Sequence, residues 1–178
     1  MLRVLIAGLL GGLAMFAWET VGHVLLPFGE MGISRLDNEV AVRDGLQATI
    51  GDAEGLYLFP AMTPGAPPPG PGVSGLLMYH PAPGSPFNPL TFVWELAIEL
   101  IQGVALALVM SALAPHALVS RLGAAILVGV AASVATEASY TVWYGFPWNY
   151  LFAQMALVIV GYAAAGLVIA MMVRPRQA

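Results

Sequence analysis

Four long apolar stretches constrain this chain more than any other feature of its sequence. A helix needs about 20 mostly apolar residues to cross the hydrocarbon core of a bilayer. The stretches are residues 1–26, 90–113, 118–144 and 150–173. Only 9% of the residues are charged, whereas water-soluble proteins carry roughly 25%. The sequence therefore predicts an all-α membrane protein with four transmembrane helices, and the lipid bilayer is its first expected partner.

The first stretch also has some features of a signal peptide. Arg3 supplies a short charged start, and residues 4–17 supply an apolar core. The apolar residues continue beyond Ala17 to Leu26, however, which is further than a signal peptide requires. We therefore expect an uncleaved helix.

The arginines predict how the helices are oriented, because cytoplasmic ends of membrane helices are enriched in Lys and Arg. The turn at residues 145–149 has no basic residue. Both termini are therefore expected in the cytoplasm, with residues 27–89 on the other side. The arginines that flank the cytoplasmic ends in this arrangement are Arg3, Arg121, Arg174 and Arg176.

Residues 27–89 predict a small α/β extracytoplasmic cap between the first two helices. Asp37 is placed to cap the N-terminus of a short helix that ends at Gly51. Residues 55–60 and 75–81 each begin at Gly, are rich in strand-forming residues and stop at Pro, which is typical of a hairpin.

The two expected strands are joined by residues 63–72, which hold five Pro and three Gly. Such a segment is a flexible or polyproline connector without a core of its own. We expect it to tolerate shortening.

Several short motifs stand out in the first half of the chain. They are LPFGEMGI at residues 26–33, LDNE at 36–39 and GLYLFP at 55–60, together with Trp18 and His23. With these motifs the chain resembles a family of small, uncharacterised bacterial four-span inner-membrane proteins. The resemblance covers roughly the first 80 residues. It implies a multi-pass protein of the bacterial inner membrane and no established activity.

A few polar side chains lie inside the apolar stretches, where they are costly and often functional. Four of them are glutamates: Glu19, Glu95, Glu99 and Glu137. At about 1.5 Å per helical residue, these glutamates lie roughly 8 to 14 Å from the expected outer ends of their helices. Antiparallel helices then bring them to similar depth in the outer leaflet, on stripes of small residues. We predict one cavity with candidate metal ligands Glu19, His23, Glu95, Glu99 and Glu137, lined also by Gln102, Tyr140 and Gln154.

The spacing of Gly8 and Gly12 predicts where the first helix approaches a neighbour closely.

Four carboxylates in one apolar cavity cannot all be ionised without a counter-charge. Two solutions stay open: protonated glutamic acids that bond one another, or a bound cation. A divalent metal ion suits carboxylate and imidazole ligands, although the di-iron motif Glu-x-x-His is absent from the spans.

Composition excludes several functions. A net charge of -4 argues against a nucleic-acid partner, and the absence of Cys excludes thiolate sites. We expect an accessory or small binding protein that is not an enzyme. Its outer-leaflet Glu/His cluster is expected to bind a cation or protons, and its cap to meet another membrane protein. The alternative is a membrane-embedded metalloenzyme that uses the Glu/His cluster.

Overall fold

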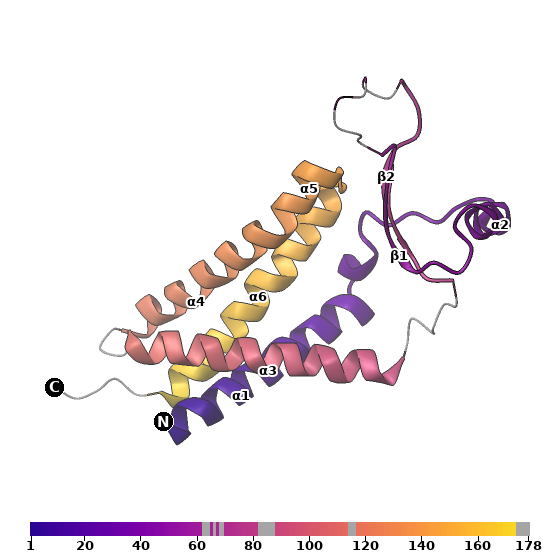
Figure 1. The fold of residues 1–178 in the computed structure, drawn as a ribbon. Coiled ribbons are helices and arrows are strands. Elements are labelled where there is room, and N and C mark those ends of the chain that lie inside the picture. The colour runs from indigo at the N-terminus through magenta and orange to yellow at the C-terminus, as the bar shows by residue number, and fades with distance from the viewer. Residues whose placement is uncertain (62–64, 66, 68–69, 82–87, 114–116, 174–178) are drawn as a thin grey trace. The chain divides into compact units, whose positions relative to one another are not determined.

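The computed structural model describes residues 1–61, 65, 67, 70–81, 88–113 and 117–173 (Figure 1). The chain divides into two compact units. A helical unit consists of Met1–Ile33 and Pro89–Ala178, and a second unit consists of Ser34–Asn88.

Among the residues that the structure describes, the helical unit contains four helices that are long and apolar enough to cross a membrane. They are α1 (Leu2–Val24), α3 (Pro89–Ala112), the stretch Leu118–Tyr144 and α6 (Trp148–Met172). The third of them is built from α4 (Leu118–Ser133), a π-helical turn η2 (Val134–Ala138) and α5 (Ser139–Tyr144). A short 3-10 turn, η1 (Pro27–Glu30), follows α1. The prediction of four apolar spans is confirmed, and such a set is typical of a multi-pass membrane protein.

Within this unit α1 packs against α3 and α6, and α6 also packs against α4 (Figure 1). Glycines bring α1 and α3 into backbone contact. A Cβ atom on Gly12 would lie 2.5 Å from the carbonyl oxygen of Glu99, and one on Gly8 would lie 2.6 Å from Cα of Val104. The predicted close approach at these two glycines is therefore found, and Gly103 is its counterpart on α3.

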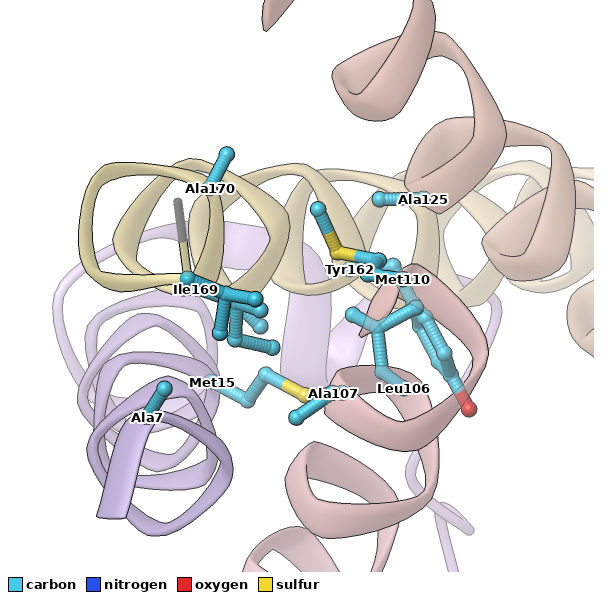
Figure 2. Close-up of a cluster of buried hydrophobic side chains, with 11 residues drawn as sticks. Ala7, Met15, Leu106, Ala107, Met110, Ala125, Tyr162, Ile169 and Ala170 are labelled. Atoms are coloured by element: carbon cyan, nitrogen blue, oxygen red, sulfur yellow. The ribbon is translucent and has the colours of Figure 1, made fainter. Parts of the chain in front are cut away.

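A cluster of buried side chains from all four spans forms the core of the helical unit (Figure 2). Leu106 and Met110 come from α3, Ile169 comes from α6 and Met15 comes from α1. Alanine and glycine fill much of the remaining contact surface, so the helices lie close together with few large side chains between them.

The second unit contains α2 (Glu39–Ile50) and two antiparallel strands, β1 (Gly55–Phe59) and β2 (Gly75–Tyr79). Both predicted strands are therefore found. Tyr57 faces Leu77 across the pair.

The predicted N-cap of α2 is wrong by one residue. Asn38, not Asp37, is the cap, and its side-chain oxygen accepts a hydrogen bond of 3.1 Å from the backbone N–H of Ala41. Both residues have side chains suited to the role, and the backbone selects the one that precedes the first helical turn. Gly51 ends the helix as predicted, with φ of 68°.

Some predictions concern residues outside the described part of the chain. Arg174 and Arg176 lie there, as do residues 63, 64, 66, 68 and 69 of the connector. The orientation in the membrane and the position of the second unit as a cap therefore stay predictions.

Candidate functional site

The helical unit brings three glutamates of α1 and α3 together, and we call them the carboxylate cluster: Glu19, Glu95 and Glu99. Glu99 interacts electrostatically with both other members, and Glu19 interacts with Glu95. Glu95 and Glu99 share one face of α3 because they are four residues apart. The glycine contact places α1 beside this face, since Gly12 lies against the backbone of Glu99.

Glu99 is the most enclosed member of the cluster. Its exposed fraction is 5%, whereas Glu95 is exposed. In the described part of the chain, Oε2 of Glu99 is buried without a hydrogen-bond partner. An unpaired carboxylate oxygen in an apolar interior is costly, because its bonds to water are lost and nothing replaces them. Glu99 is therefore the position at which this helical unit most needs a positive charge or a donated proton.

Glu19 lies at the edge of the cluster, beside His23. Oε2 of Glu19 is 3.5 Å from Nδ1 of His23, and the same nitrogen is 2.9 Å from the backbone oxygen of Glu19. Gly161 of α6 makes room for the carboxylate, because a Cβ atom there would lie 3.7 Å from Oε1 of Glu19. Since the side chain of His23 is 46% exposed, His23 lies at the rim of the cluster and Glu99 lies inside it.

Gln102 belongs to the same region and has a partner that the sequence pattern did not single out. The hydroxyl of Tyr162 on α6 donates a 2.8 Å hydrogen bond to Oε1 of Gln102, and Tyr162 also interacts with Glu99. A tyrosine in the middle of an apolar span, next to Gly161, was the available signal. This hydrogen bond links α3 to α6 beside the carboxylate cluster.

Glu137 has different surroundings. It lies half-buried in the π-helical turn η2, and Tyr150 of α6 is an electrostatic partner. Its Oε1 lies 3.4 Å from the hydroxyl of Thr136. The structure thus gives Glu137 local contacts of its own.

The other two predicted cavity residues are less enclosed than Glu99. Tyr140 is 47% exposed and stacks on Phe146, with ring centroids 5.6 Å apart. Gln154 is half-buried in α6. Both residues are thus more exposed than Glu99.

The predicted five-residue metal site receives no support from the geometry. Among the described residues, no three His, Asp or Glu side chains are placed to hold a metal ion together. Of the predicted ligands, Glu19, Glu95 and Glu99 form the cluster, and His23 reaches only its rim.

The second unit holds a separate groove of about 740 Å³ between α2 and β2. Val40, Leu46 and Leu77 line it together with Arg43 and His80. His80 also pairs with Glu54 at 2.9 Å, a contact that sequence reasoning did not assign. The lining also carries the polar side chains of Glu39, Asp44, Gln47 and Tyr79.

The chain matches no protein-family model, no curated protein and no solved structure. The carboxylate cluster is therefore interpreted from its own geometry.

Proposed function

We propose that this chain is a small binding protein of the membrane, which holds a proton or a cation at the carboxylate cluster. The observation that carries the proposal is Glu99, which is 5% exposed and has an unpaired carboxylate oxygen. Buried ionisable groups inside membrane helices are conspicuously rare and mark ion or proton sites.

The charges around Glu99 support the proposal. Two further carboxylates, Glu19 and Glu95, lie near enough to repel a negative charge there. Across the described residues, the basic side chain paired with the cluster is that of His23, which contacts Glu19. Because like charges in an apolar region cannot all persist, the cluster needs a bound cation or a proton shared between carboxyls.

The location forms part of the same proposal. The resemblance in residues 26–33 and 55–60 suggests the bacterial inner membrane, and the arginines suggest that both termini are cytoplasmic. The cluster would then lie in the outer leaflet, where ions from outside can reach it through exposed Glu95. The second unit would lie outside and could meet another membrane protein.

A carbodiimide experiment tests the site. Dicyclohexylcarbodiimide is apolar and reacts with protonated carboxyl groups, so it reports on carboxylic acids inside membranes. We expect mass spectrometry of the purified full chain to find the label at Glu99. Slower labelling in the presence of Na⁺ or Mn²⁺ would identify a cation at the site, and labelling that these ions leave unchanged would identify a proton.

Two variants serve as test and control. Glu99→Gln keeps the shape of the side chain and should abolish both the labelling of this position and any protection by the cation. Glu137→Gln removes a carboxyl from another span and should leave both unchanged. The proposal is wrong if wild-type Glu99 stays unlabelled and Na⁺ and Mn²⁺ change the thermal stability of wild type and Glu99→Gln equally.

A further inference from the structure

Arg121 is a second buried charge, far along the chain from the carboxylate cluster. The positive-inside pattern predicts it as a flanking residue at a helix end, yet its exposed fraction is 3%. It lies in the first turn of α4, where the helix begins at Leu118. A cation this enclosed needs a negative partner, because the cost of removing it from water is several kcal/mol.

The guanidinium uses only part of its hydrogen-bonding capacity. Nη1 donates a 3.2 Å bond to the backbone oxygen of Ala170 in α6. Nε and Nη2 are buried and have no partner in the described part of the chain. These two nitrogens are the side-by-side pair of an arginine, and their N–H groups point in the same direction. Such a fork matches two oxygens of one phosphate or carboxylate group.

No acidic side chain of the described residues forms an ion pair with Arg121; the pairs present join His23 to Glu19, Arg43 to Glu39 and His80 to Glu54. The bond to Ala170 places the guanidinium against the last turn of α6, where backbone oxygens carry partial negative charge. That contact satisfies Nη1 and leaves the fork of Nε and Nη2 for another group.

The N-terminus of α4 adds a second source of positive potential. Its N-cap is Ala117, which offers no side-chain hydrogen bond, and its first turn has no acidic residue. The first N–H groups of a helix are unpaired and attract anions. Side chains on a helix lean toward its N-terminus. Ala125, one helical turn after Arg121 in α4, packs on Gly166 of α6, whereas Arg121 itself contacts Ala170. The side chain of Arg121 therefore extends over the turn of α4 that precedes it.

We propose that Arg121 and the N-terminal turn of α4 bind a phosphate group, supplied by the headgroup of an anionic phospholipid or by free phosphate. The depth fits a lipid, because Arg121 is three residues, or about 4.5 Å, along α4, close to where headgroup phosphates meet the acyl chains. The fork binds two phosphate oxygens, and the first amides of α4 bind a third. This site is separate from the carboxylate cluster, so either proposal can fail without the other.

The test measures thermal stabilisation of the purified full chain in a neutral detergent. The two probes are short-chain phosphatidylglycerol and inorganic phosphate, each titrated separately. We expect phosphatidylglycerol to stabilise the wild type in a saturable way. If phosphatidylglycerol stabilises the protein and inorganic phosphate does not, the site binds a lipid headgroup. If inorganic phosphate stabilises it equally, the site binds the soluble ion.

Three variants separate the site from general charge effects. Arg121→Met removes the fork, and we expect its affinity for the effective probe to fall at least about tenfold. Arg121→Lys keeps a charge without the fork and should show a similar loss. Arg3→Met removes an exposed arginine from α1 and should bind as the wild type does.

Either of two results overturns the proposal. One is a wild type that neither probe stabilises, a result that holds even if the Arg121 variants fail to fold. The other is unchanged affinity in Arg121→Lys, because a simple charge would then be sufficient and no fork would be involved.

Discussion

The helical unit and the second unit are held together by different kinds of contact. In the helical unit, backbones touch directly, as Gly12 of α1 does against Glu99 and Leu100 of α3. In the second unit, α2 has no buried residue at all. Its connection to β2 depends instead on Tyr79, which is 8% exposed and has its hydroxyl 2.8 Å from Oε1 of Gln47 and 2.9 Å from the backbone oxygen of Gly51.

This difference teaches how each unit obtains its stability. Lipid chains are as apolar as leucine, so membrane helices gain little by burying large apolar side chains and depend on close packing of small residues. A two-stranded hairpin is marginal without a packed face, so a few well-placed polar contacts matter more there. Substitutions should therefore act through steric clash in the helical unit and through lost hydrogen bonds in the second.

The largest effect is expected for Gly12→Ala. The new Cβ atom would lie 2.5 Å from the carbonyl oxygen of Glu99, so the backbones of α1 and α3 must separate. We expect a loss of about 3 kcal/mol in the free energy of unfolding, measured in detergent by denaturant or heat. Gly123→Ala is the matched control, because nothing lies within 4 Å of its Cβ position and the change should be neutral or slightly stabilising. Equal stability of the two variants would show that backbone contact does not hold the helical unit together.

A smaller effect is expected for Tyr79→Phe. The change removes the hydroxyl that lies near Gln47 and Gly51 and leaves their oxygens without this partner. We expect about 1.5 kcal/mol less local stability, seen as faster amide hydrogen exchange in α2 and β2 of the full chain. Tyr57→Phe is the control, since its hydroxyl bonds the backbone oxygen of Ala53 at an exposed position. If α2 exchanges at the wild-type rate in Tyr79→Phe, the unit depends on contacts other than this hydroxyl.

The smallest effect is expected at the start of α2. Asn38→Ala removes the side-chain oxygen that accepts from Ala41, and a lost N-cap costs about 1 kcal/mol. Asp37→Ala should change the stability of α2 by less than about 0.5 kcal/mol, because a surface substitution away from a cap has little effect. Hydrogen exchange in the first turn of α2 measures both. A larger loss of stability in Asp37→Ala than in Asn38→Ala would show that Asp37 is the N-cap, as the sequence predicted.

Sequence patterns predicted the individual elements of the fold because each depends on local properties. A span of apolar residues such as 118–144 forms a helix in a bilayer whatever its neighbours are, since its backbone must bond internally. The strands at 55–59 and 75–79 were visible because β-prone residues lie between Gly and Pro. The shared face of Glu95 and Glu99 follows from helical periodicity.

Only the tertiary structure decided which polar groups meet. The helical periodicity of one span shows which of its residues share a face, but it does not specify which helix that face contacts. The close contact of Gly12 and Gly103 brings α1 beside α3, where Glu99 interacts with Glu19. The meeting of Glu137 with Glu99 was inferred from depth alone and stays a prediction. The bond from Tyr162 to Gln102 depends on how α6 packs against α3. The burial of Arg121 likewise arises only where α4 and α6 come together, because a charge that flanks a span in the sequence can still be covered by a neighbouring helix.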